Sequence, residues 1–387
     1  MENNISEKEN FTVTFFSNFL LHHQTPFCDA MYDILGDNFK FVATTPVPAD
    51  RLEMGYKDLS GVKPYSVNAY LGDKEKEYAK ELGEKSDVVI LGDAPIEYIE
   101  KRLLKNKLTF RYSERFFKDG RWRILDPRVL RAHYNQSYKF RNKNYRILCA
   151  GAYVKGDCDF LSCFKNKKYR FGYFPERPYI SSPEETIKDK EKFSILWVGR
   201  FVKLKHPELA LYVAKRLKKD GIDFTLTFEG DGDLKPKIEK AVSRAGLCEN
   251  VKFTGFASPD EVLEKMKKSD LFLFTSDKKE GWGAVLSESM SCCCAVIANE
   301  KTGSAPYLIK DGENGFMYNG RPRELYKKVK LILKDQSLKN KIQLNAFRTI
   351  NEEWNADVSA KRLIRLIKEI NSGKDSPFSD GPLSKDD

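Results

Sequence analysis

The chain has 387 residues, of which 41% are hydrophobic, 12% aromatic and 32% charged, and its formal net charge is +11. This length exceeds one typical domain, so we expect two, each with a sizeable core. No apolar run approaches the roughly 18 residues of a membrane-spanning helix, and the polar, acidic start has no secretory signal pattern. The eight cysteines lack the spacing of a disulfide framework, which favours reduced packing cysteines in a cytosolic protein.

The charge is unevenly distributed along the chain. Residues 1–100 carry 9 basic and 18 acidic residues, whereas residues 101–180 carry 21 basic and 6 acidic residues with many interleaved aromatics. Such a stretch suits an anionic membrane surface or lipid carrier. The alternative is a solvated face whose charge is balanced in space by the acidic first hundred residues. No nucleic-acid motif accompanies the charge, so we expect no nucleic-acid partner.

In the first half, apolar runs predict strands and the segments between them predict helices. Strands are expected at 11–16, 39–44, 87–91, 108–112 and 146–150. Helices are expected at 29–35, 74–84, 95–105 and 127–141. This alternation is typical of a parallel sheet.

The second half repeats the pattern more regularly after a proline-rich linker. Strands are expected at 194–198, 224–229, 251–254, 271–274 and 295–298. Helices are expected at 207–219, 234–245, 259–268, 284–293, 322–334, 337–349 and 356–370. The short spacing between strands matches doubly wound βα units, and the polar end of the chain is expected to be a disordered tail.

The stretch 271–298 reads as strand, glycine-rich loop, helix and strand. Its loop ends in Glu280-Gly281-Trp282-Gly283, and Glu288 lies about one turn into the following helix. Glycines at a helix start let backbone N–H groups approach an anion, which the helix dipole also favours. Because two carboxylates would repel that anion, they should bind hydroxyls instead. The pattern therefore indicates a ligand that carries both phosphate and sugar.

Two other strand ends carry candidate residues. Gly199 and Arg200 follow the strand at 194–198, and Lys205 comes five residues after Arg200. Ligands of open α/β sheets bind at the carboxyl ends of strands, where these two cations could clamp a diphosphate. Glu229-Gly230-Asp231-Gly232 closes the next strand and could equally be an ordinary tight turn.

These motifs, in this order, resemble glycosyltransferase family 4, the retaining GT-B glycosyltransferases of group 1 type. The resemblance covers 193–318 and includes 251–256, 311–316 and two glutamates, Glu280 and Glu288, with seven residues between them. It implies an α/β fold of GT-B architecture, with two Rossmann-like doubly wound domains facing across a cleft. The implied domains are 1–172 for the acceptor, a linker at 173–190, 191–355 for the nucleotide-sugar, a helix at 356–371 packing back towards the first domain, and a disordered tail at 372–387.

The resemblance also implies residue roles. Arg200 and Lys205, with Glu280, would be the catalytic residues, because the two cations neutralise the donor's diphosphate and Glu280 binds hydroxyls of the transferred sugar. Glu288 would bind the ribose. The donor-binding set would be completed by residues that line the diphosphate or the base, namely Gly199, Gly255, Phe256, Gly281, Trp282, Gly283 and Ala284.

The chain departs from the family pattern in several places. Cys293 and Ala295 stand where glycine and proline are common, which should alter packing and not abolish activity. Position 206 is histidine where glycine is frequent. In the first half the resemblance is much weaker, so the acceptor-side candidates, His22, His23 and Glu114, remain alternatives to ordinary loop residues.

Two short acidic patterns match the D-x-D motif of metal-dependent transferases, Asp157-Cys158-Asp159 and Asp231-Gly232-Asp233. We expect no metal at either, because the pattern is common and two cations with a helix dipole can replace an ion at the leaving phosphate. No cofactor is expected.

The sequence therefore predicts a cytoplasmic glycosyltransferase of hexosyltransferase type, associated peripherally with the inner face of the membrane. It would move a sugar from a nucleotide-diphosphate-sugar to a saccharide or lipid-linked saccharide in envelope or capsular polysaccharide synthesis. One alternative is a metal-dependent transferase or a nucleotide-sugar epimerase. Another is a non-catalytic nucleotide-sugar-binding protein.

Overall fold

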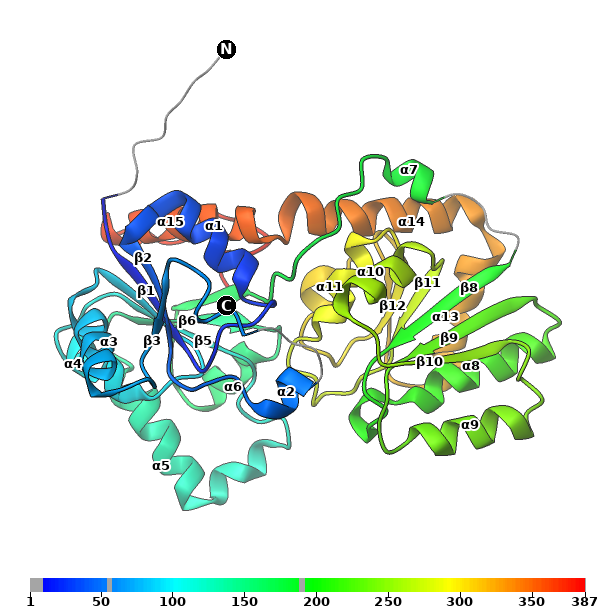
Figure 1. Ribbon diagram of the computed structural model, residues 1–387, viewed down its shortest axis with the longest axis horizontal. Helices are drawn as coiled ribbons and strands as arrows, with labels where there is room; N and C mark the ends of the chain where they lie inside the picture. The colour runs from blue at the N-terminus through cyan, green and yellow to red at the C-terminus, as the bar shows by residue number, and fades with distance from the viewer. Residues whose placement is uncertain (1–9, 54–57, 188–191, 387) are drawn as a thin grey trace, which may run out of the picture. The chain divides into compact units, whose positions relative to one another are not determined.

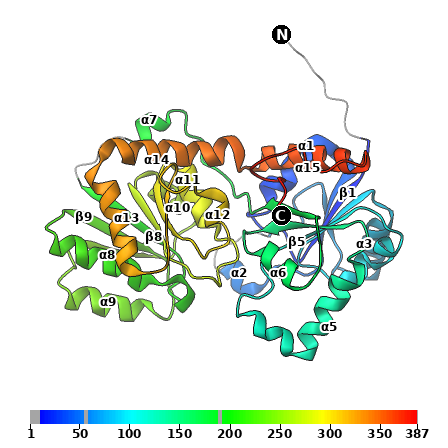
Figure 2. The same cartoon turned by 180° about the vertical axis from the view of Figure 1, so that it is seen from behind.

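The computed structural model of the chain describes residues 10–53, 58–187 and 192–386. The chain divides into two compact units (Figures 1 and 2). The first unit comprises Met1–Pro175 and Asn355–Asp387, and the second comprises Glu176–Trp354. Each unit contains one parallel sheet with helices, which confirms the predicted α/β class with two Rossmann-like sheets.

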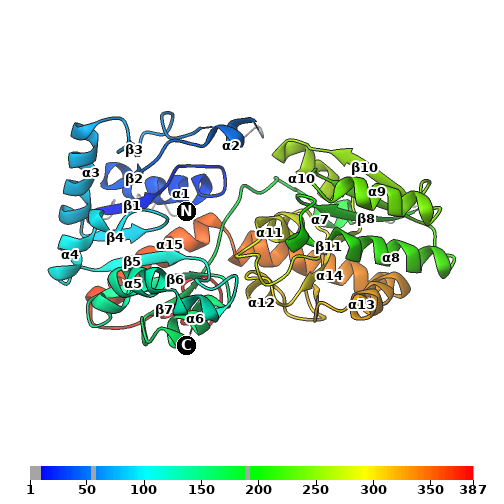
Figure 3. The ribbon, with the colours of Figure 1, turned by 90° about the horizontal axis from the view of Figure 1, so that it is seen from below.

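The first unit is built on a seven-stranded parallel sheet with strand order β3-β2-β1-β4-β5-β6-β7, which can be followed in Figure 3. Its strands are β1 (Val13–Ser17), β2 (Phe39–Ala43), β3 (Ser66–Asn68), β4 (Val88–Leu91), β5 (Thr109–Ser113), β6 (Tyr145–Ala150) and β7 (Lys168–Phe171). All residues of β1 and β4 are buried. That uninterrupted burial is expected of central parallel strands covered on both faces.

Helices of the first unit cover this sheet. They are α1 (Thr25–Leu35), α2 (Ala49–Glu53), α3 (Asp73–Lys85), α4 (Glu100–Leu104), α5 (Pro127–Gln136), α6 (Val154–Phe160) and α15 (Ala356–Asn371). The helix α15 returns from the far end of the chain and packs against α1 (Figures 1 and 2). Its N-cap residue is Asn355, whose side chain accepts a hydrogen bond from the N–H of Val358.

The second unit has a six-stranded parallel sheet with strand order β10-β9-β8-β11-β12-β13. Its strands are β8 (Phe193–Val198), β9 (Phe224–Glu229), β10 (Val251–Gly255), β11 (Leu271–Phe274), β12 (Ala295–Asn299) and β13 (Phe316–Tyr318). The chain starts at β8, winds outward to β10, and then crosses to β11 on the other side. The order of strands therefore reverses between β8 and β11, which is the position where such sheets bind ligands.

Helices of the second unit lie on both faces of its sheet. They are α7 (Pro183–Thr186), α8 (Pro207–Lys219), α9 (Lys235–Arg244), α10 (Pro259–Lys267), α11 (Ala284–Ser291), α12 (Ala305–Leu308), α13 (Pro322–Lys334) and α14 (Gln336–Arg348). The predicted start of α10 is confirmed by a complete capping box between Ser258 and Glu261. No described helix is long and apolar enough to cross a membrane.

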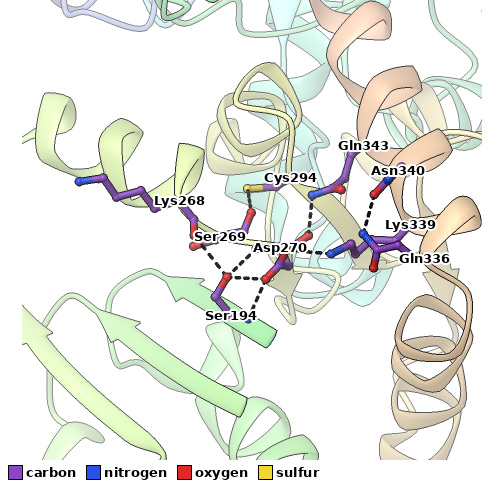
Figure 4. Close-up of polar contacts among 9 residues, drawn as sticks. All are labelled: Ser194, Lys268, Ser269, Asp270, Cys294, Gln336, Lys339, Asn340 and Gln343. Atoms are coloured by element: carbon purple, nitrogen blue, oxygen red, sulfur yellow. Dashed lines mark hydrogen bonds and ion pairs between the residues drawn. The ribbon is translucent and has the colours of Figure 1, made fainter. Parts of the chain in front are cut away.

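A buried polar network ties the amino-terminal ends of these strands to α14 (Figure 4). Asp270 accepts hydrogen bonds from the N–H and hydroxyl of Ser194 and forms a 3.0 Å ion pair with Lys339. Both charged side chains are almost completely buried, with 2% and 6% exposure. The carbonyl of Asp270 also accepts from Gln343. Each charge is compensated, as burial requires.

The end of the chain is not the disordered tail that its polar composition predicts. It lies along β7, where the N–H of Arg170 donates to Ser384 and the N–H of Leu383 donates to Arg170. The Leu383 side chain is fully buried, and Asp380 forms a 2.7 Å ion pair with Arg170. The prediction was wrong because β7 is an edge strand, whose open backbone groups bind a segment with little core of its own.

The structure also differs from the prediction at short elements. Strands β3, β7 and β13 were missed, and the helix predicted at 95–105 is a 3-10 turn followed by α4. The linker predicted at 173–190 lies largely in the second unit, which begins at Glu176, and 188–191 lie outside the described residues. All eight cysteines are free thiols, as predicted, and Cys293 adopts a left-handed backbone with φ of 61° at the end of α11.

Candidate functional site

The predicted donor-side residues lie in the second unit, at the carboxyl ends of β8 and β11 where the strand order reverses. Gly199 and Arg200 follow β8, and Glu280 to Gly283 follow β11. The two loops are joined by backbone and hydroxyl contacts. The N–H of Asp277 donates to the carbonyl of Leu204, and the Thr275 hydroxyl donates to the carbonyl of Lys205. Residues far apart in sequence thus form one surface.

An ion pair between Lys205 and Glu280 links these loops. The Lys205 Nζ lies 2.5 Å from Oε2 of Glu280, and each of the two side chains is 15% exposed to solvent. Lys205 ends the short helix η5 (Lys203–Lys205), after which His206 adopts a left-handed backbone and contacts Asp277. The carboxylates of Glu208 and Asp277 contact the two ring nitrogens of His206 and raise the pKa of its imidazole. The hydrogen bond with Glu208 is the largest cause of this pKa shift.

Arg200 differs from Lys205 in having no partner among the described residues. Its side chain is exposed and makes no hydrogen bond or ion pair anywhere in the described part of the chain. The turn behind it is held tightly, because a Cβ on Gly230 would lie 2.2 Å from the carbonyl oxygen of Gly199. The N–H of Phe201 also donates to Asp231 in that turn. The turn at 229–232 therefore supports the end of β8, while the Arg200 charge remains available.

The start of α11 has the geometry that an anion site requires. Gly283 precedes the helix with φ of 87°, and a Cβ there would lie 2.2 Å from Cζ of Phe274. The N–H groups of Gly281 and Gly283 donate no hydrogen bond within the described ranges. The Ser304 hydroxyl fixes the loop by donating to the carbonyl of Trp282. Open N–H groups at a helix start attract negative charge.

Trp282 and Phe256 differ in solvent exposure. The Trp282 side chain is 1% exposed and packs against Tyr307 and Trp354, so the contribution of this residue to the loop is structural. Phe256 is 59% exposed next to Gly255, which has φ of 73° and accepts a hydrogen bond from the N–H of Gly230.

The side chain of Glu288, on α11, is partly buried. Burial raises the pKa of its carboxyl group to about 7, although the Lys205 charge opposes this shift. No hydrogen bond reaches its carboxylate from any described residue. A partly buried carboxyl group that accepts no hydrogen bond and lies near a cation is typical of a functional site and not of a structural ion pair.

The acceptor-side candidates lie in the first unit, and two of them converge on one tyrosine. Burial, and then the nearby charge of Glu114, raises the pKa of the Tyr173 hydroxyl, and the Tyr173 ring centre lies 6.4 Å from that of His23. His22 lies on His23 with 3.7 Å between ring centres. Burial, then His22, lowers the pKa of His23 to about 3, so His23 is neutral.

Tyr173 and Tyr112 were missed by the sequence reasoning. The Tyr112 hydroxyl donates to the carbonyl of Gly172, and the ring centres of Tyr112 and Tyr173 are 5.8 Å apart. Tyr112 and His23 line a small pocket with Gln24, Gly172 and four phenylalanines, Phe15, Phe27, Phe171 and Phe174. Only the short strand β7, which was not predicted, could have indicated that Tyr173 follows a strand end.

Three of the four aspartates in the two D-x-D patterns form ion pairs within the fold. Asp157 is buried between Arg115 and Arg121, whereas Asp159 forms a 3.0 Å ion pair with Lys168. Asp231 forms a 2.9 Å ion pair with Lys235 and accepts from the N–H of Gly232. Local structure therefore explains Asp157, Asp159 and Asp231, whereas Asp233 is exposed and has no hydrogen bond or ion pair among the described residues.

The two parallel sheets, with cations and an open helix start at one strand-order reversal, define the GT-B glycosyltransferase fold. Solved structures agree with this class. The structure of Anabaena Alr3699/HepE in complex with UDP superposes with a TM-score of 0.68 at 13% identity, covering 92% of this chain and 99% of that one.

Residues 180–349 match the family model described as "Glycosyl transferases group 1". A Campylobacter jejuni N-acetylgalactosamine-N,N'-diacetylbacillosaminyl-diphospho-undecaprenol 4-alpha-N-acetylgalactosaminyltransferase is 33% identical over 42% of this chain and 44% of its own length. The capsular polysaccharide biosynthesis glycosyltransferase CapH of Staphylococcus aureus is 30% identical over 32% of this chain and 35% of its own. The matched segment thus spans less than half the length of these relatives.

Proposed function

We propose that the protein is a retaining glycosyltransferase that moves a sugar from a nucleotide-diphosphate-sugar to a saccharide or lipid-linked saccharide, in envelope or capsular polysaccharide synthesis. One observation carries the proposal. The unpartnered Arg200, the Lys205–Glu280 ion pair and the open N–H groups before α11 meet where the strand order reverses. Relatives named for a diphospho-undecaprenol-linked acceptor and for capsular polysaccharide support the acceptor class.

In this proposal donor binding exchanges the partners of one ion pair. Lys205 leaves Glu280 for the diphosphate, and Arg200 and the N–H groups of the helix start add to the neutralisation. Glu280 is then free to accept hydrogen bonds from hydroxyls of the sugar, and Glu288 to accept them from the ribose. Gly255 and Phe256 lie by the base. Two cations and a helix dipole aimed at the leaving phosphate supply what a metal ion otherwise would.

The chemical step follows from that charge distribution. The bond between the anomeric carbon and the diphosphate oxygen breaks while the acceptor hydroxyl approaches from the same face. The departing phosphate takes the hydroxyl proton, and Arg200 and Lys205 stabilise the charge that develops on it. Retention of configuration follows from this front-face route. We propose no metal or other cofactor, and turnover should persist in the presence of a chelator.

A thermal-shift panel of nucleotide-sugars tests the donor site, because a ligand that binds only the folded state raises the melting temperature. Arg200→Ala should remove most of the shift and lower turnover at least about tenfold, as expected for a lost oxyanion contact. Arg323→Ala is the matched control, because Arg323 is also exposed and without a partner among the described residues of the second unit. Equal shifts in both variants would refute the assignment, and an inverted product anomer by NMR would refute retention.

We further propose that the acceptor is presented at an anionic membrane surface and that the basic 101–180 stretch contacts that surface.

A further inference from the structure

Residues 118–143 form a projecting basic segment of the first unit, which we term the basic arm. It contains η3 (Arg121–Leu125), α5 and η4 (Tyr138–Phe140). In Figures 1 and 2, α5 lies at the rim of the first unit, on the side away from α1 and α15. The amphipathic helix α5 buries no residue completely. This arm is therefore a surface element and not part of the core.

Large apolar side chains of the arm face solvent. Trp122 is 67% exposed and Leu125 is 81% exposed. Leu130 and Tyr134, one helical turn apart on α5, are each about half exposed. The inner side of α5 is different, because His133 packs its ring against Phe116 and Phe117. Solitary exposed apolar residues need no explanation, but several on one arm indicate a contact surface.

The charge of the arm is almost entirely positive. It contains eight lysines and arginines and two aspartates, a net charge of +6. Both aspartates are already paired within the arm, Asp119 with Arg123 and Asp126 with Arg128. Arg131 lies beside Leu130 on α5, exposed and with no partner among the described residues. Exposed basic and apolar residues thus alternate along the arm.

The arm is also held firmly by the body of the unit. The buried carboxylate of Asp157 on α6 accepts a hydrogen bond from the N–H of Phe117. The guanidinium of Arg121 donates to the carbonyl of Gly156 at 2.7 Å. The exposed side chains are therefore presented by a fixed support, so contact with a flat surface would need little reordering.

We propose that the basic arm docks on an anionic phospholipid surface, with Trp122, Leu125, Leu130 and Tyr134 entering the interface and the arginines contacting the lipid phosphates. Aromatic and leucine side chains between arginines match the polarity gradient at that boundary. Other occupants fit less well. A two-fold dimer through the arm would oppose two charges of +6, and a nucleic-acid backbone would leave the leucines without an apolar partner.

Docking on such a surface would give the proposed transferase access to a membrane-linked acceptor. Only this link to the acceptor rests on the proposed function. Binding itself needs neither donor nor acceptor. The two proposals therefore fail independently: a failed donor panel leaves docking intact, and failed docking leaves the donor panel intact.

Vesicle flotation of the full chain tests the docking surface. The protein should float with vesicles of phosphatidylcholine and phosphatidylglycerol, less so as salt rises, and not with phosphatidylcholine alone. The double variant Trp122→Ser/Leu125→Ser should weaken binding at least about tenfold, and Arg128→Gln/Arg131→Gln should weaken it in a salt-dependent way. Val62→Ser/Leu71→Ser is the matched control, because these residues are 72% and 68% exposed on the same unit, outside the arm.

The chain supplies its own reporter for the same experiment. Of its four tryptophans, all within the described residues, Trp122 is exposed, while Trp197, Trp282 and Trp354 are at most 4% exposed. Anionic vesicles should shift the emission to the blue and protect it from acrylamide. Flotation that is unchanged in the arm variants would overturn the proposal. So would the absence of binding to anionic vesicles, or arm-dependent dimers or RNA complexes in place of vesicle binding.

Discussion

Replacing Glu288 with glutamine should stabilise the protein at alkaline pH while it abolishes donor binding. The Glu288 carboxyl group is partly buried on α11, accepts no hydrogen bond from the described residues, and has a pKa raised by burial from 4.5 to about 7. The folded state therefore holds the Glu288 proton more tightly than the unfolded chain does. Ionising this group costs free energy of folding, and glutamine cannot ionise.

The size and pH range of the effect follow from the pKa. Each unit of pKa difference corresponds to about 1.4 kcal/mol, so the full shift is worth about 3 kcal/mol. Because the side chain is only partly buried, we expect about 1–2 kcal/mol. The cost of ionisation is absent below about pH 4.5, grows as the pH rises to about 7, and is constant above that. Glu288→Gln should therefore match the parent at pH 4.5 and exceed its stability at pH 8.

Urea unfolding followed by tryptophan emission measures this difference, because three of the four tryptophans are buried in the second unit. Glu239→Gln is the matched control, since Glu239 is exposed on α9. A stability difference that does not change between pH 5 and pH 8, or a variant less stable at pH 8, would refute the reasoning. A normal thermal shift with nucleotide-sugars would separately remove Glu288 from the donor site.

Three further substitutions test the arguments about buried charge and backbone conformation. Lys339→Ala should lower the free energy of unfolding by about 3–5 kcal/mol in urea, because it leaves Asp270 buried without its cation; a loss under about 1 kcal/mol would contradict this. Gly283→Ala should cost about 2–3 kcal/mol and weaken donor binding, since its Cβ meets Phe274 at a positive φ, whereas unchanged binding would show that the loop is not needed. Ser162→Gly should raise stability by about 0.5–1 kcal/mol, because Ser162 is exposed with φ of 52°; a lower melting temperature would count against the strain argument.

The regular parts of the fold could be predicted because each element carries its own signal. Strands such as β8 and β11 are apolar runs followed by turn residues, and the amphipathic helices between them leave little choice of topology. The missed strands are three or four residues long, too short for a periodic pattern. The tail was misjudged for a related reason: its order depends on hydrogen bonds to β7, a partner about 200 residues away.

The residues of the candidate site also differ in how far the sequence could predict them. Donor-side residues such as Arg200 and Glu280 occur within local motifs at strand ends, so the sequence indicated them together. The first unit offers no such motif. His23 and Glu114 acquire significance only through Tyr173, which folding brings to them from another strand. Sequence reasoning could therefore name candidates there, but it could not choose the contacts between them.

A comparison of two arginines shows which charges the fold uses and which it leaves for a ligand. Arg102 is fully buried, and its guanidinium donates to the Thr109 hydroxyl and to the carbonyls of Gly83, Ser86, Asp87 and Leu108. Every donor is satisfied, so Arg102 is committed to structure. Arg200 satisfies none of its donors within the described chain, and it follows β8 at the same strand-order reversal where the open N–H groups and the Glu288 carboxyl group follow β11. Folding leaves this cluster of unmet polar groups at one point of the sheet, and a ligand with phosphate and hydroxyl groups would complete it.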